Sequence, residues 1–462
     1  LVIGIDDYDF SWKLKKGESF STPEVCLTYS ADGFSKLSQT LHQAIVSNLI
    51  RSCWKDRVRP ILVNNWEATY FDFNKDNLIA IAKEAAELNL DMLVLDDGWF
   101  GKRDDDFSGL GDWFVNEKKL CGTLSELVKE VHDMGLSFGL WFEPEMISED
   151  SDLYRAHPDW ALVVPGRQPI RSRSQLVLDM SREDVTDYLT ERICDIVEKA
   201  DIQYIKWDMN RSLMAAYSAK LPRDRQGELR HRYVLGLYKV LEAVTQRFPE
   251  LLLEGCSGGG GRFDAGMLYY CPQIWCSDNT DAIERLRIQY GTSFGYPMSS
   301  VSAHVSVCPN HQNHRVTPFK TRGICAMQGT FGYELDLSKM TDEEKKMARE
   351  QIAFFKEHGK LFQFGDYYRL TSPFENRDYT VWEYAAQDGS EACMSVVYTD
   401  MYANAASEIV KWKGLDPKKV YQMQLDGEDA GNFSGAALMH AGILLPLPEQ
   451  NYDAFQIYLK AE

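Results

Sequence analysis

The sequence predicts an α/β protein: a (β/α)8 TIM barrel with a C-terminal antiparallel β-sandwich domain and a remnant of an N-terminal β-domain. The chain has 462 residues, enough for a barrel and a smaller domain. From about residue 60 to 300, short apolar runs alternate with amphipathic stretches, as in repeated βα units. Near residue 365 the helical period gives way to turn-rich alternating segments. We therefore expect three parts, at residues 1–55, 56–362 and 363–462.

The first part resembles the end of a larger unit. The runs LVIGIDDYDFSWKL and VCLTYSA predict a strand pair, and SKLSQTLHQAIVSNLI predicts a polar linker helix. The first residue is Leu rather than Met, and the chain opens on an apolar run. We therefore expect a cut N-terminus with no readable targeting signal.

The second part contains eight runs with strand character. They are ILVNNW (61–66), DMLVLDD (91–97), LSFGLWFEP (136–144), QLVLDM (175–180), QYIKWD (203–208), LLLEGC (251–256), QIWCSD (273–278) and SSVSAHV (299–305). Helical patterns with apolar residues at steps of three and four lie between them, at 76–88, 124–135, 183–200 and 231–248. Eight such units predict a closed barrel.

The third part contains segments with alternating apolar residues, separated by Gly, Asn and Asp turns. They are YYRLTS, DYTVWEYA, EACMSVVYT and DAFQIYLKA. Because these segments have no helical period, they predict an antiparallel β-domain after the barrel.

Composition excludes several classes of partner. The formal charge of −19 disfavours nucleic acid and anionic lipid, and no apolar run is long enough to cross a membrane. The ten cysteines include no C-x-x-C pair, which favours reduced thiols in a cytoplasmic enzyme. Aromatic residues make up 12% of the chain, and their flat rings either fill the core or stack on sugars.

Polar residues that end the strands of such a barrel are candidates for its active site. The residues at these positions are Trp66, Asp96, Asp97, Trp141, Glu143, Lys206, Asp208, Glu254, Cys256 and Asp278. Acids, Trp and a single Lys are suited to holding hydroxyl groups and stabilising a cationic transition state. The set therefore indicates a site for a sugar ring.

Two carboxylates of this set suit glycoside hydrolysis, which needs one ionised and one protonated acid. Lys206 and Asp208 share one face of a strand, so the lysine charge would keep Asp208 ionised. The alternative is a structural ion pair in the barrel mouth. Asp278 follows an apolar wall of Trp275 and Cys276, which would raise its pKa and keep it protonated.

Neighbouring signals have alternative interpretations. Adjacent Asp96 and Asp97 either bind sugar hydroxyls or anchor a loop, and Asp281 is better explained as the N-cap of a helix. The glycine run at 256–264 lacks the Lys-Ser/Thr of a phosphate loop, so we expect it to let the backbone approach a ligand.

One further segment contains residue types that bind zinc. It holds His304, Cys308, His311 and His314, but their spacing is short and irregular. We therefore expect no metal and no cofactor.

Seven ordered blocks resemble the signature of α-galactosidases of glycoside hydrolase family 36. They are WEATYFDF, LDDGWFG, GLWFEPEMI, IKWDMNR, LEGCSGGGGRFD, WCSDNTDAIERLRIQYG and HVSVCPNHQ, within residues 64–320. The resemblance implies a barrel with a C-terminal β-domain that hydrolyses terminal α-galactosyl residues of melibiose or raffinose with retention. It also implies that the partner is an α-galactoside oligosaccharide.

The resemblance gives roles to individual residues. It makes Asp208 the nucleophile and Asp278 the general acid/base, and it makes Glu143 and Glu254 structural. Its sugar contacts fall on Trp66, Asp96, Asp97, Trp141, Arg173, Lys206, Asn210, Cys256, Ser257 and Gly258.

Other functions on the same scaffold remain open at this point. They are α-N-acetylgalactosaminidase, raffinose-type galactosyl transfer, a sugar-binding protein without catalysis, and a zinc-dependent hydrolase. Family members usually carry a sizeable N-terminal β-sandwich that helps to build an oligomer, and here only its end is expected. We therefore expect a homo-oligomer when the full-length chain is present.

Overall fold

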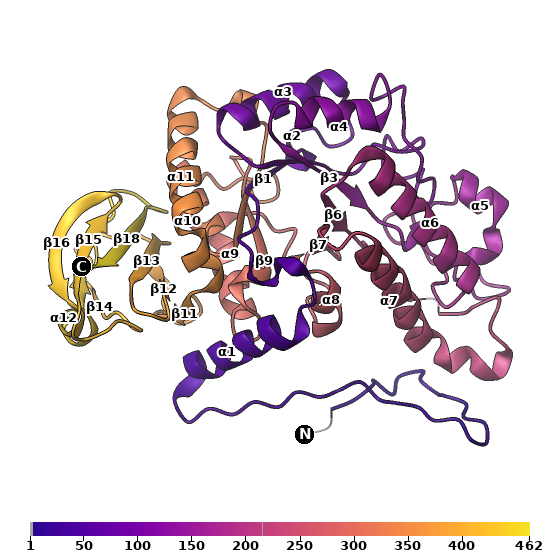
Figure 1. The fold of residues 1–462 in the computed structure, drawn as a ribbon, viewed down its shortest axis with the longest axis horizontal. Helices are drawn as coiled ribbons and strands as arrows, with labels where there is room; N and C mark the ends of the chain where they lie inside the picture. The colour runs from indigo at the N-terminus through magenta and orange to yellow at the C-terminus, as the bar shows by residue number, and fades with distance from the viewer. Residues whose placement is uncertain (1–2, 215) are drawn as a thin grey trace.

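The computed structural model describes residues 3–214 and 216–462, and it contains a closed barrel of eight parallel strands (Figure 1). This confirms the predicted barrel. In order around it, the strands are β1 (Leu62–Asn64), β10 (Thr330–Glu334), β9 (Val301–Ser306), β8 (Gln273–Trp275), β7 (Leu252–Gly255), β6 (Tyr204–Trp207), β3 (Ser137–Phe142) and β2 (Met92–Leu95). Their carboxyl ends share one face of the barrel, where side chains from distant parts of the chain meet.

One of the eight predicted strands is wrong. In the segment 175–180, only β5 (Leu176–Val177) is a strand, and it pairs with β4 (Met146–Ile147) outside the barrel. Both residues of β5 are buried, so this apolar run has the composition of a barrel strand without belonging to the barrel.

The eighth strand is β10, which the sequence reading missed. Its five residues, TFGYE, include Gly332 and end in a charged residue, so they form no apolar run. A methyl group at Gly332 would lie 2.7 Å from the His304 ring and 2.9 Å from the Leu62 carbonyl oxygen. The glycine therefore allows close packing against both neighbouring strands.

Helices cover the outside of the barrel (Figure 1). The main ones are α3 (Lys75–Glu87), α4 (Leu124–His132), α6 (Glu183–Ala200), α7 (Leu229–Arg247), α9 (Ala282–Thr292), α10 (Phe319–Ala326) and α11 (Asp342–Phe364). Shorter helices are α2 (Trp66–Thr69), α5 (Asp152–Ala156) and α8 (Ala265–Tyr270), with 3₁₀ turns at Cys53–Asp56, Pro158–Trp160, Arg223–Glu228, Met298–Ser300 and Leu337–Lys339. Capping boxes begin α3, α4 and α11, where a polar side chain bonds the otherwise unpaired backbone N–H groups.

An antiparallel β-domain follows the barrel, as predicted (Figure 1, yellow). Its six-stranded sheet has the order β11 (Asp366–Arg369), β12 (Tyr379–Ala385), β13 (Glu391–Tyr398), β18 (Ala454–Ala461), β15 (Val420–Leu425) and β16 (Glu428–Ser434). A two-stranded sheet of β14 (Ile409–Val410) and β17 (Ile443–Leu444), together with α12 (Gly435–His440), completes it.

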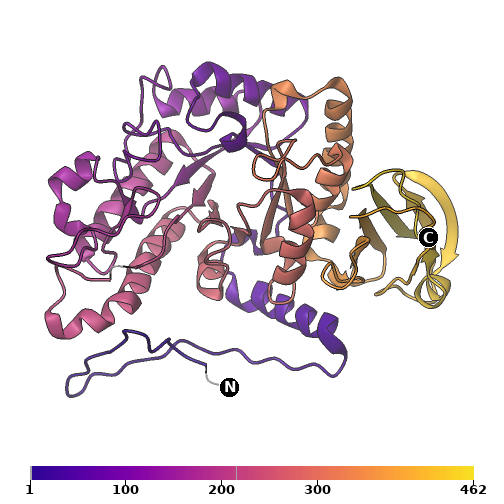
Figure 2. The ribbon, with the colours of Figure 1, turned by 180° about the vertical axis from the view of Figure 1, so that it is seen from behind.

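The N-terminal strand pair is not formed, and this corrects the prediction. Residues 1 and 2 of the first expected strand lie outside the described residues, and residues 3–32 contain no strand. This segment runs in an extended path along one side of the barrel (Figures 1 and 2). It contacts α7 through Trp12, whose ring faces Arg232 at 4.7 Å, and no described strand pairs with it. A strand needs a hydrogen-bonded neighbour, so the apolar pattern alone does not produce one.

The predicted linker helix is present as α1 (Gly33–Ala44), which continues as a π-helical turn at Ile45–Leu49. No helix among the described residues is long and apolar enough to cross a bilayer.

Candidate active site

A pocket of about 190 Å³ lies at the carboxyl ends of the barrel strands. Most of its lining residues are acidic, aromatic or hydrogen-bonding. They are Trp66, Glu67, Asp96, Asp97, Trp141, Arg173, Lys206, Asp208, Asn210, Cys256, Trp275, Asp278, Thr280, His311, Gln312 and Glu334. The pocket therefore brings together ten of the twelve residues that the sequence assigned to catalysis and sugar binding.

Asp208 directly follows β6 and is held by three donors. Trp141 Nε1 donates to Asp208 Oδ2 over 3.2 Å, Asn210 Nδ2 donates to the same oxygen over 2.7 Å, and the Met209 N–H donates to Oδ1 over 2.8 Å. Donors of this kind favour the ionised carboxylate, which accepts hydrogen bonds through both oxygens. They also fix its orientation in the pocket.

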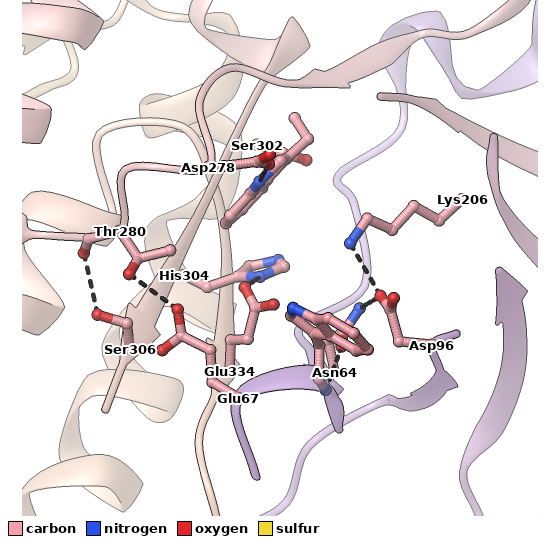
Figure 3. A network of polar contacts seen from close by, with 12 residues as sticks. Asn64, Glu67, Asp96, Lys206, Asp278, Thr280, Ser302, His304, Ser306 and Glu334 are labelled. Carbon is pink, nitrogen blue, oxygen red and sulfur yellow. Dashed lines mark hydrogen bonds and ion pairs between the residues drawn. The ribbon is translucent and has the colours of Figure 1, made fainter. Parts of the chain in front are cut away.

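Lys206 lies in the pocket as expected, but its partner is different. Its Nζ donates to Asp96 Oδ2 over 2.8 Å, and Asn64 Nδ2 donates to the same oxygen over 2.6 Å (Figure 3). Burial opposes the lysine charge most strongly, but Asp96, Glu334 and other negative groups together outweigh burial, so the pKa of Lys206 is raised well above its usual value. The direct support of Asp208 therefore comes from neutral donors rather than from this lysine.

Asp278 follows β8 and lies in a different environment. Trp275 Nε1 donates to its Oδ1 over 3.1 Å, and Gln312 Nε2 donates to its backbone carbonyl over 2.9 Å. Burial raises the pKa of Asp278, and the negative charge of Asp208 raises it further. Two carboxylates of one pocket thus differ in the number of donors that hold them.

The adjacent acids Asp96 and Asp97 both line the pocket, with different partners. Asp97 accepts hydrogen bonds from Arg103 Nε at 3.1 Å and Arg103 Nη2 at 2.7 Å, in a buried ion pair that holds the loop after β2. Burial raises the pKa of Asp97, and Arg103 opposes the rise. Each acid therefore has a structural partner and also faces the pocket.

Glu143 and Glu254, which end β3 and β7 in the sequence reading, are buried outside the pocket lining. Glu143 Oε1 accepts hydrogen bonds from Gln175 Nε2 at 2.7 Å and from the Asn210 N–H at 2.5 Å. Burial and the charge of Asp208 raise the pKa of Glu143 to about 8. Glu254 Oε2 accepts from Gln273 Nε2 over 2.8 Å.

Of the remaining predicted sugar contacts, some line the pocket and others do not. Arg173 and Cys256 line the pocket, and Arg173 has a left-handed backbone with φ of 50°. Ser257 and Gly258 are not among the lining residues. Ser257 Oγ instead donates to the Cys256 carbonyl and accepts from Arg262 Nε at 2.6 Å.

Glycines of the run at 256–264 pack closely against neighbouring backbone, and the approach of this run to a ligand stays a prediction. A methyl group at Gly259 would lie 2.7 Å from the Asp278 nitrogen, and one at Gly260 would lie 2.5 Å from the Cys276 carbonyl oxygen. These glycines therefore allow the loop after β7 to contact the backbone that carries Asp278. Asp281 caps α9 by accepting from the N–H groups of Ile283 and Glu284, as predicted.

The sequence reading missed several lining residues as site residues. They are Glu67, Trp275, Thr280, His311, Gln312 and Glu334. Glu334 is the last residue of β10, so recognising that strand would have identified it by the strand-end rule. Glu67 follows Trp66 directly in the first block, but only the partners seen in the structure indicate its position.

The histidines considered as zinc ligands contact separate carboxylates. His304 Nδ1 lies 3.3 Å from Glu334 Oε2, and His311 Nδ1 lies 3.3 Å from Glu67 Oε1. Within residues 3–214 and 216–462, no group of three or more His, Cys, Asp or Glu is arranged to hold a metal ion.

Two family models match the chain. The model described as Melibiase matches residues 19–365, and the model of the glycosyl hydrolase family 36 C-terminal domain matches residues 379–459.

Similar proteins include two curated bacterial enzymes. The chain is 53% identical over 456 residues to the bifunctional alpha-galactosidase/sucrose kinase AgaSK of Mediterraneibacter gnavus, covering 99% of this chain and 48% of that protein. It is 52% identical over 459 residues to alpha-galactosidase AgaA of Geobacillus stearothermophilus, covering 99% of this chain and 62% of that one. The chain thus spans less than two thirds of the length of either relative.

Solved structures of α-galactosidases also match this chain. The crystal structure of AgaA matches with a TM-score of 0.97 at 52% identity, covering 99% of this chain and 63% of that one. A variant of AgaA, which matches with the same TM-score at 51% identity and the same coverage, was solved in complex with raffinose.

Proposed function

Because the chain belongs to the melibiase family of glycoside hydrolases, we propose that it hydrolyses terminal, non-reducing α-D-galactosyl residues of oligosaccharides such as melibiose and raffinose, with retention. The main support is the pair of carboxylates in one pocket with opposite environments. Asp208 has three hydrogen-bond donors, whereas burial and a neighbouring charge favour the protonated form of Asp278. Retaining glycosidases need this difference between a nucleophile and a general acid.

In the proposed mechanism, an Asp208 oxygen attacks the anomeric carbon as the bond to the glycosidic oxygen breaks. Asp278 gives its proton to that oxygen, and the leaving sugar departs as an alcohol. Asp278, now ionised, then takes a proton from water, whose oxygen attacks the anomeric carbon and releases Asp208. The two displacements return α-galactose and restore both carboxyl groups.

We propose that the other predicted contacts bind the galactosyl ring. Asp96, fixed by Lys206 and Asn64, presents a buried carboxylate to the pocket, and Asp97 does so beside it. Trp66 and Trp141 add aromatic surface. The raffinose complex of the AgaA variant supports a substrate of this class.

The deciding experiment follows the sugar released from an aryl α-galactoside by proton NMR before mutarotation. α-Galactose as the first product supports both the substrate class and retention. β-Galactose as the first product contradicts the role of Asp208 as nucleophile. Release from an aryl α-N-acetylgalactosaminide instead, or of no sugar at all, contradicts the proposed substrate.

We also propose that the chain works in a reducing, cytoplasmic environment and that the full-length protein is a homo-oligomer. All ten cysteines are free in the structure, and the buried ones are spread through the core rather than paired. Light scattering of the purified full-length protein tests the assembly, and thiol titration of the protein in cell extract tests the redox state.

A further inference from the structure

The residues proposed for the reaction leave one part of the pocket wall without a role. His311 lines the pocket, and its Nδ1 lies 3.3 Å from Glu67 Oε1. The Glu67 side chain is 1% exposed, whereas that of His311 is 34% exposed. A histidine with one ring nitrogen against a buried carboxyl group and a partly exposed ring is well placed to bind a ligand.

Glu67 joins three separate segments of the chain. Its Oε1 accepts a hydrogen bond from Thr280 Oγ1 at 2.8 Å (Figure 3). Its Oε2 accepts a hydrogen bond from the Val307 N–H at 3.1 Å. Glu67 itself lies in α2, next to Trp66. It therefore fixes the segment that carries Trp66, the segment two residues after Asp278 and the loop that carries His311.

The loop of His311 is also bonded directly to Asp278 and to Thr280, two residues further on. Gln312 Nε2 donates to the Asp278 carbonyl oxygen over 2.9 Å, and Asn310 Nδ2 donates to Thr280 Oγ1 over 3.1 Å. A general acid lies beside the leaving oxygen of the bond that it cleaves. His311 lines the same pocket as Asp278, the next residue after His311 bonds to Asp278, and His311 is more exposed than the buried Asp208. These observations place His311 on the leaving-group side of the pocket.

We propose that His311 binds a hydroxyl group of the leaving sugar and that Glu67 is the positioning residue that holds its ring. Within the described part of the chain, His311 Nε2 has no protein partner, so this nitrogen is free to hydrogen-bond a sugar hydroxyl. The inference rests on the proposed function, and it extends the proposed binding site from the galactosyl ring to the leaving sugar.

The test compares two substrates with the same galactosyl group. Melibiose has a leaving sugar with hydroxyl groups, whereas an aryl α-galactoside has none at that position. His311→Ala should lower kcat/KM for melibiose about five- to twelvefold, the value of one hydrogen bond, mainly through KM. It should leave kcat/KM for the aryl α-galactoside within about twofold. His311→Gln, which keeps a polar side chain, should recover part of the melibiose activity.

The matched control is His314→Asn, which changes a histidine of the same loop that does not line the pocket. His314 has a positive φ of 60°, a backbone conformation that asparagine tolerates. It should leave both substrates unaffected. Glu67→Gln should produce the same selective loss as His311→Ala, and the double variant should lose no more than either single one, because the two residues act as a unit. Thermal unfolding of each variant identifies any variant that fails to fold.

The outcomes separate the two proposals. A wild-type chain that cleaves neither substrate contradicts the proposed function, and with it this inference. If the wild type cleaves both, equal losses on both substrates or no loss on melibiose contradict the role of His311. Additive losses in the double variant contradict the positioning role of Glu67. If Glu67→Gln fails to fold, a binding measurement tests His311 instead. It compares the binding of melibiose and of galactose to Asp208→Asn and to the double variant Asp208→Asn/His311→Ala. The added His311→Ala change should weaken the binding of melibiose only.

Discussion

At the scale of single residues, the pocket shows how the surroundings of a carboxyl group set its chemistry. Asp208 has an indole, an amide and a backbone N–H as donors, all of which stabilise negative charge. Asp278 has one indole donor to its carboxyl group and lies near the charge of Asp208. The same side chain is thereby prepared for attack in one position and for proton donation in the other.

The proposed nucleophile gives the most direct prediction. Asp208→Asn should lower kcat by at least about a thousandfold, because an amide oxygen is a poor nucleophile and carries no charge toward the transition state. The fold should be retained, since asparagine has nearly the same shape. The matched control is Asp281→Asn, which keeps the helix cap of α9 and should retain activity. Steady-state rates on an aryl α-galactoside and thermal unfolding check both variants, and substantial turnover by a clean Asp208→Asn preparation excludes the nucleophile role.

Glu143, behind Asp208, gives a prediction about pH. Burial and the charge of Asp208 raise the pKa of Glu143 to about 8. Between its ordinary value and about 8, the folded protein keeps this proton and the unfolded chain releases it, so this group's contribution to the free energy of unfolding falls as pH rises and levels off above 8. Glu143→Gln, which is always neutral, should remove that fall.

Urea unfolding at pH 5, 6.5 and 8 measures the free energy of unfolding of Glu143→Gln and of the wild type. The stability advantage of the wild type over the variant should shrink across this range. A difference that stays constant with pH would mean that Glu143 is ionised in the folded protein.

The site residues also show what sequence can reveal at this scale. Asp96, Asp208 and Asp278 follow barrel strands, so a general rule about barrels found them. Arg173 has a left-handed backbone and lies before β5 rather than after a barrel strand, so only the family resemblance pointed to it. Glu67 is recognisable only from partners that are more than 200 residues away in the chain.

At the scale of elements, apolar runs predicted seven of the eight barrel strands. The wrong strand at 175–180 and the missed β10 have one cause. An apolar run indicates burial, and burial is not restricted to barrel strands. The run at 175–180 is buried outside the barrel, where β5 pairs with β4. In contrast, β10 is buried without being apolar throughout, because Gly332 and Glu334 contact specific neighbours. The missed strand is also why Glu334 was missed.

The loop after β7 gives a prediction at this scale. Gly259 has φ of 81°, and a methyl group there would lie 2.7 Å from both the Asp278 nitrogen and Ser277 Cα. Gly259→Ala should therefore destabilise the protein by about 1–3 kcal/mol and also lower activity, because the strain is relieved by displacing Asp278. Gly427→Ala is the matched control, since Gly427 has φ of 87° but no atom within 4 Å of the added methyl group.

Thermal unfolding and kcat on an aryl α-galactoside separate the two glycine effects. Both variants should lose stability from backbone strain, but only Gly259→Ala should lose activity in its folded state. Equal activity in the two folded variants would show that Gly259 does not affect the position of Asp278.

At the scale of the whole molecule, the hydrophobic core of the barrel extends into the C-terminal sheet, which also has a core of its own. Trp382 and Tyr384 of β12 belong to the core cluster of the barrel, whereas Val381 and Ala385 of the same strand belong to the separate core of the sheet. Successive side chains of a strand point to opposite faces, so this one strand contributes to both cores. The Tyr384 hydroxyl also donates to the Gln328 carbonyl, just before β10.

This shared core predicts that the barrel and the sheet unfold together. Calorimetry should show one transition, and its midpoint should coincide with the loss of activity on heating. Trp382→Ala should lower the free energy of unfolding by about 3–5 kcal/mol, because it leaves a cavity between the two parts. Both midpoints should therefore fall together. Val381→Ala, on the opposite face of the same strand, removes fewer atoms and should lower both midpoints by less. Two separate transitions in the wild type, or a Trp382→Ala protein whose barrel keeps the wild-type inactivation midpoint, would show that the two cores are energetically independent.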